Sequence, residues 1–211
     1  LQSKETGYPV ALTSKMPMVN FKKLTENMTH SYIYAKVQGL HIFVLHLSPS
    51  SYQKRLEEAE NILAQTKEIP AREPILIMGD FNALDASDSA YYGESILMAT
   101  KRREEKYPHL RDLNQGRLDY TVMYTFKEAG FRDSFKLMKN EFMGSMPTFK
   151  DGEGKIQEVE TGMLRRIDYV WCNAAAAKYL VKSVILKNEL TRVISDHYPV
   201  YIELALPKKE R

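Results

Sequence analysis

The sequence predicts an α/β protein in which sheets pack together and helices cover them on the outside. Three observations favour this class. Segments with strand character lie toward both ends of the 211-residue chain, helical segments are inserted between them, and no repeat or low-complexity linker interrupts the order. With 44% hydrophobic and 27% charged residues, the chain can bury a substantial core, so we expect a single domain over residues 1–211.

Seven segments have the composition of strands, because β-branched, aromatic and aliphatic residues dominate them. They are residues 8–14, 31–37, 40–48, 75–78, 166–172, 180–186 and 199–206. Within 40–48, Ile42, Val44 and His46 share one face, since side chains alternate along a strand. The run Ile75–Met78 is wholly apolar, which predicts a strand buried on both faces.

Three helices are expected between these strands. Ser50 and Ser51 can cap a helix whose apolar residues, from Leu56 to Leu63, recur at helical spacing. A second helix is predicted over residues 91–103, and a third over residues 119–129, where the following glycine can act as a C-terminal cap. The polar, glycine-bearing stretch at 146–162 is typical of a mobile loop.

Composition and charge exclude several classes of protein. The net charge of +3 permits an anionic substrate but is not the concentrated basic surface of a dedicated nucleic-acid binder. The single Cys172 excludes an internal disulfide and a cysteine-built metal site. No run of 18 apolar residues predicts a membrane span. The composition is that of a soluble globular protein; its location stays unknown, and an upstream targeting segment remains open because the chain begins at Leu1.

Polar residues of the types that enzymes use for catalysis and metal binding lie at the ends of the predicted strands. They are His46, Asp80, Asn82, Asp168, Asp196 and His197. Each also has a structural explanation: a strand-end histidine is often solvated, Gly-Asp-x-Asn usually forms a turn, and backbone amides can satisfy a buried aspartate. An acid inside an apolar strand needs a partner to stay charged, so we expect Asp168 to hydrogen-bond the His197 ring.

The order of four short motifs adds a resemblance to these observations. "HLS", "GDFN", "RIDYVW" and "SDHYPV" follow one another, each at the edge of a predicted strand, and "GYPVALTSKMPM" precedes them. From about Gly7 to Leu206, the chain resembles the endonuclease/exonuclease/phosphatase superfamily, which has the deoxyribonuclease-like fold. The resemblance implies a four-layer α/β/β/α sandwich of two packed mixed sheets with helices outside, and metal-dependent hydrolysis of phosphate esters.

The resemblance also implies catalytic roles for five residues. Asp80 matches the aspartate that orients or deprotonates the attacking water, and Asn82 the asparagine that hydrogen-bonds the phosphate region. His197 matches the histidine at the scissile phosphate, and Asp168 its carboxylate partner. His46 matches a second histidine near the phosphate or the leaving group.

The metal site implied by the resemblance combines Asp196 with Asp80 and Asn82, and these hard oxygen ligands favour Mg²⁺, with Mn²⁺ as a substitute. The family also has an asparagine on its first strand and a metal-binding glutamate in a "QE" pair, and neither is found here. In Leu1-Gln2-Ser3, a serine stands where that acid is expected. We therefore expect a domain that lacks its N-terminal portion and binds metal weakly.

Three classes of function stay open at this stage. The favoured one is a metal-dependent phosphodiesterase, nuclease or phosphatase in which water attacks directly, because no serine or cysteine lies in a triad-like setting. The alternatives are a non-catalytic binding relative that has lost its metal site, and a structural or interaction domain. The substrate is a nucleic acid, a phospholipid or a small phosphorylated molecule, and we expect a monomer.

Overall fold

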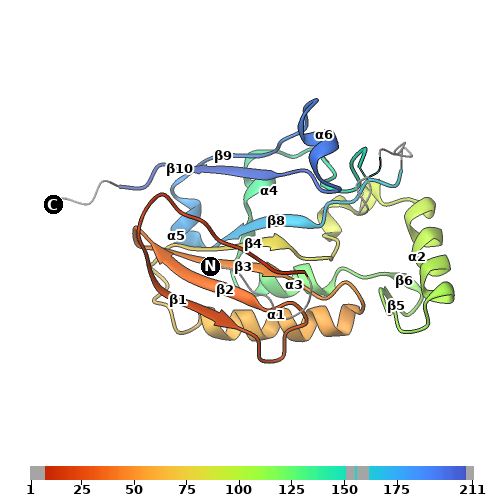
Figure 1. Cartoon of the computed structure of the whole chain (residues 1–211), viewed down its shortest axis with the longest axis horizontal. Coiled ribbons are helices and arrows are strands. Elements are labelled where there is room, and N and C mark those ends of the chain that lie inside the picture. The colour runs from red at the N-terminus through yellow and green to blue at the C-terminus, as the bar shows by residue number, and fades with distance from the viewer. Residues whose placement is uncertain (1–7, 151–154, 156–161, 208–211) are drawn as a thin grey trace.

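A six-stranded mixed sheet lies at the centre of the computed structural model, which describes residues 8–150, 155 and 162–207 (Figure 1). In spatial order, its strands are β1 (Met18–Leu24), β2 (Tyr32–Val37), β3 (Leu40–His46), β4 (Ile75–Asp80), β8 (Asp168–Cys172) and β7 (Arg132–Asp133). The β3–β4 pair is parallel and the other pairs are antiparallel. The parallel pair therefore brings the carboxyl ends of β3 and β4 to the same edge of the sheet.

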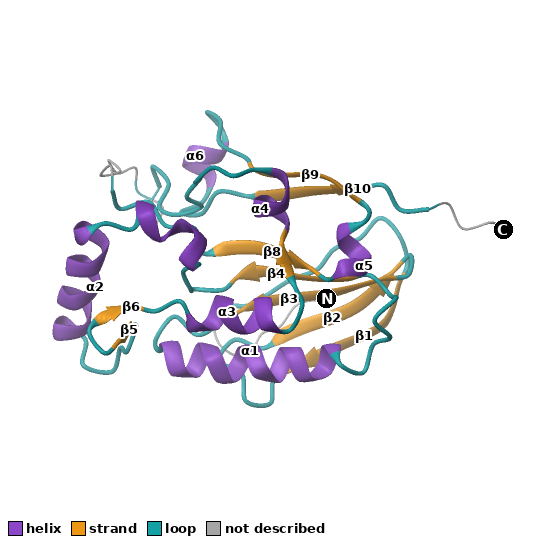
Figure 2. Cartoon of the chain, turned by 180° about the vertical axis from the view of Figure 1, so that it is seen from behind, coloured by secondary structure: helices purple, strands orange, loops and turns teal. Residues whose placement is uncertain are grey.

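Two helices cover one face of this sheet, as Figure 2 shows. They are α1 (Tyr52–Thr66) and α3 (Thr121–Glu128). Ile62 of α1 and Phe126 of α3 are fully buried against Phe43, Ile77 and Trp171 of the sheet. Burial of these large apolar side chains fixes the helical layer on the sheet.

A second, two-stranded sheet lies on the opposite face, formed by β9 (Leu180–Ile185) and β10 (Val200–Leu204). Val200 and Ile202 of β10 pack against a core that contains Ile42 and Leu76 of the large sheet. The expected packing of sheet on sheet with helices outside is confirmed. Tyr201, on the other face of β10, is 42% exposed, so the fourth, outermost helical layer stays a prediction.

The remaining elements complete the described part of the chain. They are η1 (Ala86–Tyr91), α2 (Glu94–Lys106), β5 (Leu113–Asn114), β6 (Arg117–Leu118), α4 (Ser134–Met138), α5 (Ala174–Ala177) and α6 (Thr191–Ile194). Among the residues described, no helix has the length and apolar character needed to cross a bilayer.

Six of the seven predicted strands are confirmed within a few residues at each end, as are the helices that become α1 and α3. Ser51 caps α1, where its hydroxyl accepts a hydrogen bond from the Lys54 amide at 3.4 Å. Gly130 follows α3 with φ of 83°, a conformation that glycine adopts without strain.

Two predicted elements need correction. Residues 8–14 are not a strand, because only Ala11 forms a bridge; the edge strand is β1, later in the chain. Strand β1 escaped prediction because Asn20 has φ of 53° and a bulge between Val19 and Lys22 disrupts the alternation of side chains. The helix predicted from residue 91 begins at Glu94 instead, since η1 occupies residues 86–91.

The predicted loop at 146–162 falls largely outside the described residues, which exclude 151–154 and 156–161.

Candidate active site

A histidine–aspartate pair joins the two sheets at the edge where β3 and β4 end. Asp168 begins β8, and His197 lies in the loop before β10. The His197 Nδ1 atom lies 2.9 Å from Asp168 Oδ2, so the hydrogen bond expected from the sequence is present. With Nδ1 bonded to a carboxylate, the imidazole carries its proton there and directs Nε2 away from Asp168.

Ser145 fixes this pair in place. Its hydroxyl accepts hydrogen bonds from the amides of Ile167 and Asp168 at 3.0 and 3.1 Å. Its carbonyl accepts from the amide of Tyr198 at 2.7 Å. One buried serine therefore holds the start of β8 and the loop of His197 together, a role that no pattern in the sequence indicated.

Asp80 lies at the centre of the cluster, at the end of β4. It pairs in register with Asp168 on one side and His46 on the other. The His46 Nε2 atom lies 3.4 Å from Asp80 Oδ2. One ligand atom from each of Asp80, Asp168 and His197 lies within 4.8 Å of the others. Sheet register thus brings His46, Asp80 and Asp168 together, and the loop before β10 adds His197 to them.

Asn82 adopts a left-handed backbone conformation, with φ of 48°, just after Asp80. Its amide donates to Asp80 Oδ1 at 2.7 Å, and its side-chain Nδ2 donates to the carbonyl of Leu47 at 3.0 Å. Gly-Asp-x-Asn is therefore a turn in which the aspartate side chain bonds the backbone, as its composition suggested. The same turn places Asp80 in the cluster and Asn82 beside it, so the structural role of the turn is compatible with the functional role predicted for both residues.

The two predicted histidines have opposite electrostatic environments. Burial acts to lower the pKa of His197, but the hydrogen bond and charge of Asp168, together with Asp80 and Asp196, raise it to about 9. For His46, burial, reinforced by the charges of His30 and His197, lowers the pKa to about 4. Near pH 7, His197 is a cation that can donate protons and His46 is a neutral ring.

Asp80 has an unusual pKa for a carboxyl group. Burial and the negative charge of Asp168 raise it to about 7, against the opposing charge of His197. Two facing carboxylates of this kind are stabilised by a bound cation, and hard oxygen donors suit Mg²⁺ or Mn²⁺. The residues present therefore fit a divalent metal ion, with Asp168 close to Asp80 where the sequence had suggested Asp196 and Asn82.

Asp196 and His30 complete the surroundings. Asp196 contributes to the raised pKa of its neighbour His197, but it does not belong to the cluster of close ligand atoms. The His30 ring lies 4.4 Å from the His46 ring, centroid to centroid, and Tyr8 contacts both edge-on. Sequence reasoning missed His30; the signal was its place before β2, whose Tyr32 pairs with Leu45 beside His46.

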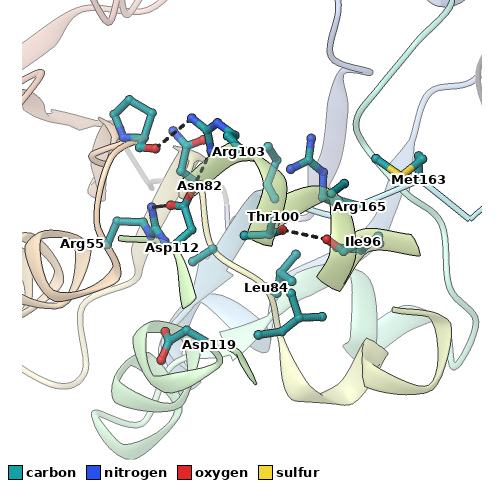
Figure 3. A pocket seen from close by; sticks show the side chains of 15 residues that line it. Arg55, Asn82, Leu84, Ile96, Thr100, Arg103, Asp112, Asp119, Met163 and Arg165 are labelled. Carbon is teal, nitrogen blue, oxygen red and sulfur yellow. Dashed lines mark hydrogen bonds and ion pairs between the residues drawn. The ribbon is translucent and has the colours of Figure 1, made fainter. Parts of the chain in front are cut away.

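A pocket of about 210 Å³ adjoins the cluster at Asn82. Its polar walls include Arg55, Arg103, Arg165 and Asp112, and Figure 3 shows these side chains around the hollow. Ile167, two residues after Arg165 and next to Asp168, also lines it. The segment from Arg165 to Asp168 thus lines the pocket and also carries the aspartate that bonds His197.

Comparisons with known proteins agree with the fold described above. The model of the Endonuclease/Exonuclease/phosphatase family matches residues 3–197. No curated protein matched the sequence. Among solved structures, an AP endonuclease from Archaeoglobus fulgidus superimposes with a TM-score of 0.61 at 16% identity, over 92% of this chain and 73% of that one.

Two further structural neighbours were determined with DNA. The 3′ phosphatase NExo from Neisseria, bound to a product DNA hairpin, has a TM-score of 0.63 at 18% identity over 92% of this chain and 73% of its own. D. rerio TDP2, complexed with a single-strand DNA product, has a TM-score of 0.57 at 17% identity over 96% and 74%. At such identities, these likenesses establish the shared fold.

Proposed function

The chain belongs to the Endonuclease/Exonuclease/phosphatase family, and on this premise we propose that it hydrolyses phosphate esters by direct attack of water, with a divalent metal ion as cofactor. The observation that carries this proposal is the cluster of Asp80, Asp168 and His197 at one sheet edge. It combines a carboxyl group that titrates near neutrality with an imidazole that stays protonated. These are the acid and base that phosphoryl transfer to water requires.

Each residue has a role that follows from its contacts. Asp168 holds the proton on His197 Nδ1, so the Nε2–H of the cationic ring is free to hydrogen-bond a phosphoryl oxygen. Asp80, in its ionised form, accepts the proton of the attacking water. His46 is neutral and can accept or donate a hydrogen bond at the opposite side of Asp80. Asn82 would hydrogen-bond the phosphate region through its side-chain amide, which donates to the Leu47 carbonyl in this structure.

Asp80 and Asp168, supported by Asn82 and Asp196, would hold Mg²⁺ or Mn²⁺. When bound, such an ion neutralises charge on phosphoryl oxygens and lowers the pKa of a coordinated water. The raised pKa of Asp80 supports this assignment, because a nearby cation would relieve the repulsion from Asp168.

We propose a nucleic acid as the substrate class. The Neisseria and D. rerio neighbours are described with DNA products, and their fold is the fold of this chain. The arginines that line the pocket beside Asn82 supply cationic groups of the kind that contact phosphates.

Hydrolysis of bis(p-nitrophenyl) phosphate in Mg²⁺ or Mn²⁺ tests the proposed reaction. We expect turnover that a chelator abolishes, and losses of roughly 10²- to 10⁴-fold in His197→Ala and Asp80→Ala. His109→Ala, which removes an exposed histidine far along the chain from the cluster, serves as the matched control and should retain full activity. Turnover that persists in chelator, or near-normal rates in Asp80→Ala, would contradict the proposal.

A further inference from the structure

Arg165 differs from the two other arginines that line the pocket beside Asn82. Arg55 and Arg103 both bind Asp112, at 3.0 and 2.6 Å. In the part of the chain that the structure describes, Arg165 has no carboxylate within ion-pair distance. Its Nη2 lies 3.2 Å from Met146 Sδ, and its Nε is buried without a hydrogen-bond partner. Figure 3 accordingly draws no bond from Arg165 to the other lining residues.

The side chain of Arg165 is half-buried, but its fully buried Nε makes this arrangement costly without a ligand. A buried guanidinium group normally has carboxylates or carbonyls around it, because its five N–H groups lose their water on burial. Burial lowers the pKa of Arg165, and the charge of Arg103 lowers it further, against the opposing charges of Asp112 and Asp80. The next residue shows the alternative, since Arg166 is buried and bonded to both Asp88 and Asp133. Arg165 is therefore a cation that forms no ion pair with a carboxylate among the residues that the structure describes.

The backbone fixes where this cation lies. The amide of Arg165 donates to the Met146 carbonyl at 2.6 Å, in a bridge that also includes Ser145. Three residues further along, Asp168 binds His197. The charge of Asp80 is close enough to influence the pKa of Arg165. The guanidinium of Arg165 thus lines the pocket on the side near the cluster of Asp80, Asp168 and His197.

We propose that Arg165 binds a second phosphate group of the substrate, next to the phosphate that is hydrolysed. This inference rests on the proposed phosphoesterase function and adds a substrate requirement to it. The planar guanidinium can bond two oxygens of a phosphate at once, and in a partly buried pocket these bonds are stronger than at an open surface. The pocket of about 210 Å³ has room for one such group, and Asn82 links it to Asp80.

Two kinds of substrate carry a second phosphate group of this kind. The second phosphate is either the neighbouring phosphodiester of a nucleic-acid strand or the additional phosphate of a small bisphosphate. A short single-stranded oligothymidine represents the first, and the nitrophenyl ester of thymidine 5′-phosphate that also carries a 3′-phosphate represents the second. The same ester without the 3′-phosphate, and bis(p-nitrophenyl) phosphate, each carry a single phosphate and serve as reference substrates.

The test compares KM and kcat of wild type, Arg165→Met and Arg165→Lys on these substrates. We expect Arg165→Met to raise KM roughly tenfold or more for substrates with two or more phosphates, as loss of a charged hydrogen bond does. For single-phosphate substrates the rise in KM should be several-fold smaller, because these substrates carry no second phosphate for Arg165 to bind. Arg165→Lys keeps the charge and should restore part of the affinity. Arg132→Met, which removes an exposed arginine on β7, is the control.

The outcomes separate the inference from the function on which it rests. A wild type that hydrolyses none of the substrates contradicts the proposed function. A wild type that hydrolyses all of them, with Arg165→Met affecting single- and double-phosphate substrates equally, contradicts the role of Arg165. If Arg165→Met raises KM for oligothymidine but not for the small bisphosphate, the second phosphate is that of a nucleic-acid strand. Should Arg165→Met fold poorly by circular dichroism, the same comparison of single and double phosphates in Arg165→Lys decides the question.

Discussion

At the scale of residues, the two histidines of the cluster have opposite charge states because their neighbours differ. His197 has three carboxylates around it, and its pKa rises to about 9. His46 is half-buried, and this burial together with the charges of two other imidazoles, His30 and His197, lowers its pKa to about 4. One sheet edge therefore offers a protonated and a neutral ring at the same pH, which suits a reaction that both donates and accepts protons.

Asp168→Asn tests the electrostatic coupling within the pair. A folded pKa above the unfolded value stabilises the protein fully below about pH 6.5, and this contribution disappears as the pH rises through about 9. The amide removes the charge and therefore lowers the pKa of His197 toward its ordinary value. We expect imidazole NMR titration of the metal-free protein to show that shift. Unfolding in urea should lose less stability between pH 6 and pH 10 in the variant. An unchanged His197 titration would contradict the coupling.

At the scale of elements, close contact between β3 and β4 holds the cluster together. Gly79 has φ of 138°, and a Cβ atom built there would lie 1.9 Å from the Leu45 carbonyl oxygen. Neighbouring residues in this register are His46 and Asp80, so the same contact sets their separation. The glycine before the aspartate is required by packing between backbones, in addition to its function as a turn former.

Gly79→Ala should consequently destabilise the protein severely. The clash involves backbone on both sides and cannot be relieved by a rotamer change, so we expect a loss of roughly 3 kcal/mol or more in the free energy of unfolding. Gly39→Ala is the matched control, because Gly39 also has a positive φ of 88° but has no atom within 4 Å of the added carbon. It should cost about 1 kcal/mol. Equal losses in urea denaturation would show that the clash is relieved.

The elements also show what the sequence could predict. Strand-type composition and helix caps located six strands and two helices, because each of these elements is specified by its own residues: β2, β3, β4, β8, β9, β10, α1 and α3. Strand β1 could not be located, since it lies at a sheet edge and is bulged at Asn20. Among the site residues, those at strand ends were predicted. Ser145, His30 and Arg165 were missed because their significance depends on contacts with distant segments.

At the scale of the whole molecule, the cluster depends on both sheets. Asp80 and Asp168 belong to the six-stranded sheet, whereas His197 lies on the loop that leads into β10 of the second sheet. Any change in how the sheets pack therefore alters the His197–Asp168 distance directly. We accordingly propose that residues 1–211 act as a single domain, with one core on each face of the large sheet.

Arg166 connects several elements of that domain. Its side chain is buried and bonds Asp88 of η1, at 2.7 Å, and Asp133 of β7. Its ring neighbour Tyr169, on β8, lies 4.5 Å from the guanidinium carbon. The arginine thus neutralises two buried carboxylates, and its position next to Arg165 places a structural cation beside the one proposed to bind phosphate.

Replacement of these adjacent arginines should therefore have opposite consequences. Arg166→Met leaves Asp88 and Asp133 without their shared cation, so we expect a loss of about 3–5 kcal/mol in the free energy of unfolding. Burial raises the pKa of Asp133, so the loss should shrink at low pH, where protonation of Asp133 removes its unpaired charge. Arg165→Met should change stability by less than about 1 kcal/mol, because no carboxylate loses a partner. Urea denaturation at about pH 5 and pH 8 measures the free energy of unfolding of both variants.

A comparable loss in the two variants would mean that Arg165 also stabilises the fold. A stable Arg166→Met would show that Lys136, 2.6 Å from Asp88, compensates for the missing charge.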